Sequence, residues 1–391
     1  MHKNILLVVM CSLIVLQQAA LSEVQWLQYR TSENAREMFG GSSQFMRIET
    51  KEKPTNELLP KASDDNPLFF KWKTSMDEKG FRWVMLDKQH KHGLCDTLYI
   101  DSDGNGRLDD EQAYTCSSSE EYENVFSQVG VRFEVEDGPV TYHINFRFYS
   151  YNERSTYLYA YSGCWYEGKV VINGEDTRII LVDYNCNGTF DDKSDSFASD
   201  RMVIGPDNHS ETKYTGNYFE YKDSLWKPVV SKDGAFVEVT SASDVPYAKV
   251  SMPKAITKFR AAGVNGMFDR TVKDGVVELP VGKYQIYSWS MSKTDDNGDD
   301  WRMDGRLSGG NKKARFEVVQ NESVDLDIGE PIYSQLDARK QGESLDFNQE
   351  LTGRFGESIS LYKSNKRSPA PKIHIRDKTG EYNRTFALSY G

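Results

Sequence analysis

The chain has 391 residues, of which 38% are hydrophobic and 12% aromatic, and its formal net charge is −11. At roughly 100–200 residues per domain, this length predicts two to four domains. The hydrophobic fraction excludes a wholly disordered chain, and the negative charge argues against nucleic acid and anionic membranes as partners, because neither would attract it.

The N-terminus has the pattern of a secretory signal peptide. A basic start precedes an apolar run over residues 5–16, and Ala20 and Ser22 are small residues at the positions that a signal peptidase reads. We therefore expect residues 1–22 to be removed and the protein to be secreted, periplasmic or on the cell surface. An uncleaved anchor is the alternative. No later stretch approaches the roughly 20 apolar residues of a membrane span, so no integral span is expected.

Most of the remaining chain has the residue pattern of β-strands. Residues 23–67 are polar and are expected to form an N-terminal segment or linker. From Leu68 onward, short alternating or apolar stretches are separated by turn residues. Strands are expected at 81–86, 97–100, 129–135, 142–149, 156–161, 169–172, 178–182, 219–221, 235–240, 276–279, 283–289, 314–319, 323–328, 358–362, 372–375 and 385–388. The best helix candidates are residues 33–38 and 118–126.

These elements predict a mainly β protein of several antiparallel β-sandwich or barrel-like modules with few short helices. Boundaries are placed near Asp244 and Ile332. The expected units are a β module at 68–243, an immunoglobulin-like or transthyretin-like sandwich at 245–330, and a C-terminal β extension at 333–391. Paired strands are expected around the turns at 173–174, 232–234, 280–282 and 320–322.

The strongest motif is an acidic, glycine-containing loop that starts at Asp101, directly after an expected strand. It reads D-S-D-G-N-G-R-L-D-D-E-Q, with acidic or amide side chains at positions 1, 3 and 5, glycine at 6, leucine at 8 and aspartate at 9. Calcium loops use this spacing, because Ca²⁺ takes six to eight oxygens at about 2.3–2.6 Å and alternate residues of a tight loop point inward together. The predicted ligands are Asp101, Asp103, Asn105, Asp109 and the backbone carbonyl of Arg107.

The end of this loop departs from the EF-hand pattern. Position 12 is Gln112, where an EF-hand has a bidentate glutamate. Either Asp110 or Glu111 closes the loop instead, or the affinity is reduced. An apolar strand precedes Asp101, where an EF-hand would have a helix. We therefore predict a calcium loop of EF-hand pattern in a β context.

A second copy starts at Asp183 and reads D-Y-N-C-N-G-T-F-D-D-K-S-D. The two copies agree in residue type at positions 1, 3, 5, 6, 8, 9 and 10. The predicted ligands are Asp183, Asn185, Asn187, Thr189, Asp191 and Asp195. Positions 1, 3 and 5 hold two carboxylates in the first loop and one in the second, so we predict tighter binding at Asp101. The alternative for both is a turn rich in Asp, Asn and Gly without an ion.

Four cysteines follow the expected signal peptide. An even number in an exported chain predicts disulfides, and we expect Cys95 to pair with Cys116 and Cys164 with Cys186. A four-cysteine zinc site is the alternative, but the chain contains no C-x-x-C spacing. Buried free thiols are a further alternative.

Three other polar features have simpler interpretations. Residues 294–301 are acidic, but their glycine is at the wrong step for an ion loop, so a solvated hairpin loop is expected. Asn265-Gly266 is interpreted as a turn. His90 and His92 lack a third metal ligand nearby in the sequence and are interpreted as exposed loop residues.

The strand followed by D-x-N-x-N-G-x-F-D-D resembles uncharacterised secreted bacterial proteins of the kind frequent in planctomycetes, over residues 97–110 and 179–205. The resemblance implies calcium and export, and no particular activity. We expect a non-catalytic, calcium-binding protein that binds a glycan or a protein partner, or has a structural role, at the cell surface or in the periplasm.

The alternative is a secreted, glycan-directed hydrolase that uses carboxylates from distant parts of the chain. No local motif such as H-E-x-x-H or G-x-S-x-G supports catalysis. Four aromatic residues are interpreted as core packing, with a sugar platform as the alternative. These residues are Trp165, Tyr166, Trp226 and Trp289.

Overall fold

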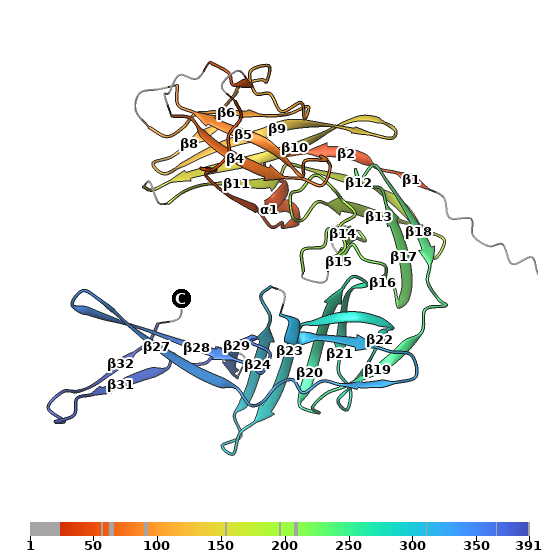
Figure 1. The fold of residues 1–391 in the computed structure, drawn as a ribbon. Coiled ribbons are helices and arrows are strands. Elements are labelled where there is room, and N and C mark those ends of the chain that lie inside the picture. The colour runs from red at the N-terminus through yellow and green to blue at the C-terminus, as the bar shows by residue number, and fades with distance from the viewer. Residues whose placement is uncertain are drawn as a thin grey trace, which may run out of the picture.

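The computed structural model describes residues 24–389 except 56–57, 62–65, 90–92, 153–154, 195–196, 207–209, 310 and 365. The expected signal peptide, the histidines His90 and His92, and the predicted ligand Asp195 lie outside the described residues. Figure 1 shows an almost entirely β-stranded chain, in which the earlier and later strands form two groups. The prediction of a mainly β protein with several antiparallel sheets is confirmed.

The first group contains four antiparallel sheets that share one hydrophobic core. The first sheet has the order β4 (Leu68–Lys73), β5 (Phe81–Asp87), β6 (Thr97–Ile100), β7 (Tyr114–Thr115). The second has the order β3 (Gln44–Arg47), β11 (Thr156–Ser162), β10 (Gly138–Ser150), β9 (Glu123–Val135), β8 (Ser118–Ser119). The third has the order β15 (Glu211–Tyr214), β14 (Arg201–Ile204), β13 (Glu175–Val182), β12 (Cys164–Ile172), β2 (Gln28–Thr31). The fourth has the order β1 (Gln25–Trp26), β18 (Phe236–Ser241), β17 (Ser224–Val230), β16 (Phe219–Tyr221).

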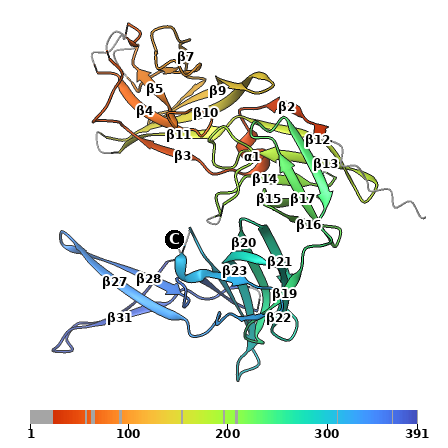
Figure 2. The same ribbon diagram turned by 45° about the vertical axis from the view of Figure 1, so that its right-hand side comes forward.

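The second group has a separate core and three sheets, and Figure 2 shows its strands from a second direction. A three-stranded sheet has the order β22 (Val276–Pro280), β19 (Tyr247–Ser251), β26 (Ser323–Asp325). A larger sheet has the order β21 (Gly266–Thr271), β20 (Ile256–Gly263), β23 (Gly282–Thr294), β24 (Asp300–Arg306), β29 (Ser358–Lys363), β28 (Ser344–Thr352), β27 (Tyr333–Gln341). Here β25 (Arg315–Val318) pairs with β23, and β30 (Lys366–Arg367) with β29. The last hairpin is β31 (Lys372–Arg376) with β32 (Asn383–Ala387).

Helical structure is minimal in the described chain. The α-helix α1 spans Ala35–Phe39, close to the range expected for it, and a 3₁₀ turn, η2, spans Lys312–Ala314. The predicted helix at 118–126 is wrong. Those residues form β8 and the start of β9, because from Glu123 onward the residues alternate between core and surface, as a strand requires.

Two predicted strand pairs are also wrong. The strands β22 and β23 are joined by a short turn, yet β22 pairs with β19 and β23 with β20 and β24. Likewise, β25 pairs with β23, whereas β26 pairs in parallel with β19. In both cases the turn carries the chain from one sheet to the other, which local turn residues do not reveal. The hairpin at Asn173-Gly174 is confirmed, with φ values of 53° and 77°.

The remaining turn predictions have mixed outcomes. The expected strands at 219–221 and 235–240 do not pair with each other, because the missed strand β17, whose pattern Pro228 interrupts, lies between β16 and β18. Within the acidic stretch 294–301, residues 295–299 form the expected hairpin loop between β23 and β24, and Asn265-Gly266 lies in the turn between β20 and β21. Residues 25–47, expected in a linker, contribute β1, β2 and β3, each paired with a later strand.

The structure contains no disulfide bond among the described residues, contrary to the two pairs expected. The backbone N–H of Cys116 donates to the carbonyl of Asp96 at 3.0 Å, which places Cys95 one residue out of register with Cys116. Cys164 and Cys186 are buried thiols, and the hydroxyl of Tyr142 lies 3.8 Å from the Cys186 sulfur.

The expected core packing of the four aromatic residues is confirmed and the sugar platform is excluded, because all four are buried. Trp289 is 1% exposed, and the other three, Trp165, Tyr166 and Trp226, are at most 8% exposed. Core packing is the correct interpretation for all four. In the described part of the chain, no helix is long and apolar enough to cross a membrane.

Candidate metal centre

The first loop begins where a fully buried strand ends. All four residues of β6 are buried, and Asp101 follows directly, held by its N–H to the carbonyl of Trp83 at 2.9 Å. Leu108, at position 8, is buried in a small cluster with Phe69, Met85 and Tyr99. The loop is therefore fixed at both ends by the core, which leaves its polar residues to face one another.

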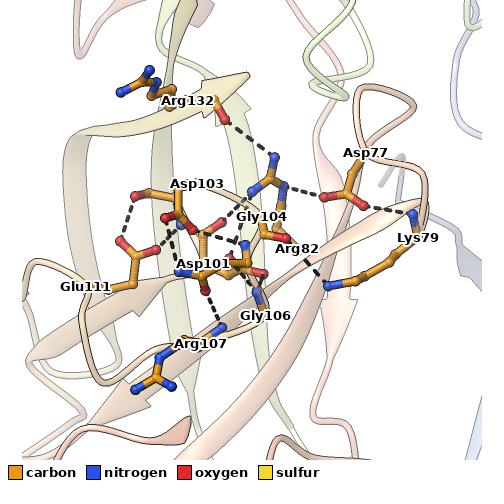
Figure 3. A network of polar contacts seen from close by, with 12 residues as sticks. Asp77, Lys79, Arg82, Asp101, Asp103, Gly104, Gly106, Arg107, Glu111 and Arg132 are labelled. Atoms are coloured by element: carbon orange, nitrogen blue, oxygen red, sulfur yellow. Dashed lines mark hydrogen bonds and ion pairs between the residues drawn. The ribbon is translucent and has the colours of Figure 1, made fainter. Parts of the chain in front are cut away.

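Three carboxylates converge inside this loop. Oxygens of Asp101, Asp103 and Glu111 all lie within 4.8 Å of one another, and this is the only such convergence of carboxylate, imidazole or thiol groups among the described residues. Figure 3 shows the three side chains gathered around the loop backbone. Oxygens that share one Ca²⁺ at about 2.3–2.6 Å lie at most about 5 Å apart, so this spacing fits a single ion.

The loop backbone supports this arrangement. Gly106 has a φ of 85° and donates its N–H to both carboxylate oxygens of Asp101, at 3.2 and 3.1 Å. The glycine is required because this left-handed conformation is unfavourable for other residues. Glu111 accepts from the backbone N–H and the hydroxyl of Ser102, at 2.5 and 2.6 Å. Glu111 therefore closes the loop from position 11, an alternative that the sequence left open.

The other ligands predicted in this loop have different partners. Asn105 donates to Asp103 and Asp110, and its carbonyl oxygen accepts from the N–H of Arg107 at 2.6 Å. The carboxylate of Asp109 forms an ion pair with the Arg107 side chain at 2.5 Å and does not join the cluster. The structure thus brings together two of the predicted side chains, Asp101 and Asp103, and adds Glu111.

A buried arginine lies beside the carboxylates. The Arg82 guanidinium is 2.8 Å from Asp77 and 3.9 Å from Asp101, and it donates to the Asp101 carbonyl at 3.3 Å. It occupies the space over Gly104, where a Cβ atom would lie 2.3 Å from the guanidinium. Sequence reasoning missed Arg82, because it lies on β5, away from the loop.

The second loop repeats this backbone scheme at a more buried position. Asp183 follows β13 and is 1% exposed, and Gly188, with a φ of 90°, donates its N–H to Asp183 at 2.7 Å. Phe190, at position 8, is buried in the main core. Asp183 also accepts a hydrogen bond from the hydroxyl of Tyr142 at 2.7 Å. This tyrosine donor distinguishes the second loop from the first.

A carboxylate from outside the second loop closes it. The backbone N–H at position 2 donates to Glu111 in the first loop and to Asp200 in the second, where the Tyr184 N–H lies 2.9 Å from Asp200. Asp200 also accepts from the N–H of Asp192 at 2.9 Å. Lys193, at the position equivalent to Glu111, instead donates to Asn217. Asp200 therefore replaces Glu111, and nothing in the loop spacing indicated it.

Asp192 connects the two amides of the second loop. Asn185 and Asn187 donate to the same oxygen of Asp192, at 2.7 and 2.6 Å. The carbonyl oxygen of Asn185 is buried without a hydrogen-bond partner, as a missing ligand would leave it. Thr189, predicted as a ligand, donates its N–H and its hydroxyl to the side-chain oxygen of Asn187. Among the described residues, the Asp191 side chain does not join this network. Asp192, the next residue, therefore takes the role that the sequence assigned to Asp191.

Burial controls the protonation of these carboxyl groups. It raises the pKa of Asp101 and Glu111 in the first loop and of Asp191 in the second. Burial also raises the pKa of Asp183 to about 7, and that of Asp200 well above its ordinary value, with the neighbouring carboxylates adding to the effect. Buried carboxylates of one sign are costly unless a cation compensates them, and a bound divalent ion would reverse these shifts.

No protein-family model, no curated protein and no solved structure matches this chain. Any functional conclusion therefore rests on the geometry of the chain itself.

Proposed function

We propose that this protein is an exported, calcium-binding β protein whose two loops hold ions that stabilise the fold for a binding or structural role at the cell surface or in the periplasm. One observation carries the proposal: oxygens of Asp101, Asp103 and Glu111 converge within 4.8 Å. Carboxylate oxygens are the ligands that Ca²⁺ prefers, and these three side chains supply part of the six to eight oxygens that the ion takes.

The second loop supports the proposal through its repeated hydrogen bonds. Asp183, Asp192 and Asp200 take part in one network with the amides of Asn185 and Asn187. Its carboxylates are more buried than those of the first loop, but they do not converge as closely. We therefore keep the prediction that the Asp101 loop binds calcium more tightly.

A glycan-directed hydrolase gains no support from the carboxyl groups with the most strongly raised pKa values. Perturbed pKa values often mark catalytic acids and bases. Asp183 and Asp200, however, are 1% and 0% exposed, so a substrate does not reach them. A structural ion site accounts for both their burial and their mutual proximity.

The test is thermal unfolding in chelator and in millimolar calcium, with magnesium as a control ion. A ligand that binds only the folded state adds about 2.7 kcal/mol to the free energy of unfolding at one hundred times its Kd. We expect calcium to raise the melting temperature of the natural chain and to leave an Asp101→Asn, Asp183→Asn double variant unchanged. Equal melting temperatures of the natural chain in chelator and calcium would refute calcium binding.

Export needs a separate measurement. The signal-peptide pattern predicts that the mature chain begins at Glu23. N-terminal sequencing of the protein from a secreting host should therefore start at this residue. A chain that keeps its first 22 residues and stays in the cytoplasm would contradict this part of the proposal.

A further inference from the structure

One face of the sheet β3-β11-β10-β9-β8 carries aromatic residues where water-facing positions are usually polar. Along β10 and β11, the buried residues Phe146, Phe148, Leu158 and Ala160 alternate with outward-facing ones. We call the outward-facing aromatic residues the tyrosine face. It consists of Phe45, Tyr149, Tyr151, Tyr157, Tyr159 and Tyr161, of which Tyr161 is covered by Arg36 and only 7% exposed.

The rings of the tyrosine face form a continuous row. Phe45 contacts Tyr157 and Tyr159 with ring centroids 5.6 and 5.3 Å apart, and Tyr149 contacts Tyr157 at 5.6 Å. Phe45 is 47% exposed and Tyr151 is 51% exposed. Tyr149, Tyr157 and Tyr159 are half-buried, so the row as a whole is partly exposed. A contiguous aromatic surface that reaches water is uncommon on a soluble protein and marks an interaction site. Figure 2 shows β3, β11 and β10 side by side, with α1 nearby.

Two arginines lie at opposite ends of this row. Arg36, on α1, lies over the ring of Tyr161 at 4.3 Å, and Arg47 is directly opposite Tyr157 in the sheet. The four-residue step from Tyr157 to Tyr161 spans about 13 Å at 3.3 Å per residue. No carboxylate of the described chain forms an ion pair with either arginine. Both guanidinium groups are therefore available to an anionic partner.

A third arginine shows which anion this face accommodates. Arg147 is opposite Tyr159 and lies over the ring of Tyr161 at 5.7 Å. It forms ion pairs with two carboxylates, Glu37 and Glu123, each at 3.5 Å. On this face, Arg147 therefore lies over a tyrosine ring and pairs with carboxylates at the same time. Arg36 and Arg47 have the same chemistry and can pair with carboxylates of a ligand.

We propose that the tyrosine face binds a polysaccharide that carries carboxylate groups. The weakly positive C–H face of a pyranose ring stacks on the negative face of an aromatic ring, and tyrosine hydroxyls can hydrogen-bond sugar hydroxyls. A row of rings on an open sheet suits an extended polymer. Arg36 and Arg47, beside residues of β11 that are about 13 Å apart along the strand, then pair with carboxylates on separate sugar units.

The net charge of −11 does not oppose this assignment at short range. At physiological ionic strength, charges are screened beyond about 8 Å, so the arginines beside the rings decide the local attraction. The tyrosine face lies on the sheet of β3, β11 and β10, whereas the ion loops follow β6 and β13. Because Gln44 on β3 donates to the carbonyl of Cys186 in the second loop, binding is measured with and without calcium.

The test is calorimetric titration of the full chain with oligogalacturonate, a short polymer of uronate sugars. Dextran is the neutral control and dextran sulfate is the sulfated control. The titrations are run in chelator and in calcium, because uronate chains bind calcium themselves. We expect binding to oligogalacturonate in both buffers, weaker binding to dextran sulfate and none to dextran.

Three variants locate the site. Tyr157→Ala with Tyr159→Ala, and separately Arg36→Gln with Arg47→Gln, should each weaken binding by at least about tenfold. Tyr333→Ala removes a tyrosine that is 53% exposed on another sheet, and it should bind like the natural chain. Melting temperatures confirm that each variant is folded.

Several results would overturn the proposal. These are no binding at millimolar oligogalacturonate, equal affinity for dextran, tighter binding of dextran sulfate, or face variants that bind normally. Sedimentation provides a last check on the occupant of the face. A dimer of the natural chain that dissociates on Tyr157→Ala with Tyr159→Ala would assign the face to a second copy of the chain instead.

Discussion

The two ion loops have the same local design in different surroundings. Each begins with an aspartate after a buried strand, turns at a glycine whose N–H donates to that aspartate, and inserts an apolar residue at position 8 into a core. In the first loop, Asp101 is 2% exposed beside Arg82, whereas Asp103 is exposed and Glu111 is half-buried. In the second, Asp183 and Asp200 are almost fully buried beside Tyr142.

The two loops therefore differ in what they are expected to contribute, calcium affinity in one and fold stability in the other. The first loop has the better oxygen geometry for an ion and keeps a cationic neighbour. In the second loop, Asp183 and Asp200 depend on protein partners for their hydrogen bonds, because water does not reach these two carboxylates. We therefore expect the first loop to dominate calcium affinity and the second to dominate stability.

The largest expected effect is on stability in the second loop. Asp183→Ala leaves the Tyr142 hydroxyl and the N–H of Gly188 without their acceptor in a buried region. At 1–3 kcal/mol for each unpaired buried group, we expect a loss of about 3 kcal/mol or more. Asp101→Ala should cost about 1–2 kcal/mol, since its main backbone donor is only partly buried. Urea unfolding at pH 6 in chelator measures both, and equal losses would break the comparison.

The second effect is the pH dependence of stability without calcium. Asp183 has a pKa of about 7 in the folded chain, well above the value expected in the unfolded chain. Between these values, the folded state holds a proton that the unfolded state has lost. Stability in chelator should therefore fall as the pH rises toward 7, by more than about 1 kcal/mol. Asp183→Asn lacks this titration and should show a smaller fall. Parallel pH profiles for the two proteins would exclude Asp183 as the cause.

The smallest expected effect distinguishes the ligands indicated by geometry from those indicated by sequence. Glu111→Gln keeps an acceptor for Ser102 but removes a charge from the carboxylate cluster. It should weaken the tighter calcium site by about tenfold. Asp109→Asn makes the same charge change at a residue that pairs with Arg107, and it should have little effect. Calorimetric titration of both variants decides this, and a larger loss for Asp109→Asn would restore the ligand set predicted from sequence.

About half of the strands and the first positions of both loops were predictable from the sequence, because their signals are local. Alternation with a period of two identifies a strand, and a glycine at position 6 follows from a turn that requires a positive φ. The predicted helix at 118–126 shows the limit of such local patterns. The predicted pairings of β22 with β23 and of β25 with β26 failed for a related reason, since a short turn does not determine which sheet receives the next strand.

The residues that complete each site were decided by the tertiary structure. Asp200 reaches the second loop because β14 pairs with β13, which returns the chain to the point where Asp183 begins the loop. Arg82 reaches the first loop because β5 pairs with β6. The exposed aromatic residues follow the same principle. Alternation in the sequence places the tyrosines of β10 and β11 on one face of the sheet and the residues between them on the other. Which face meets water was determined only by the packing of the sheets on a shared core.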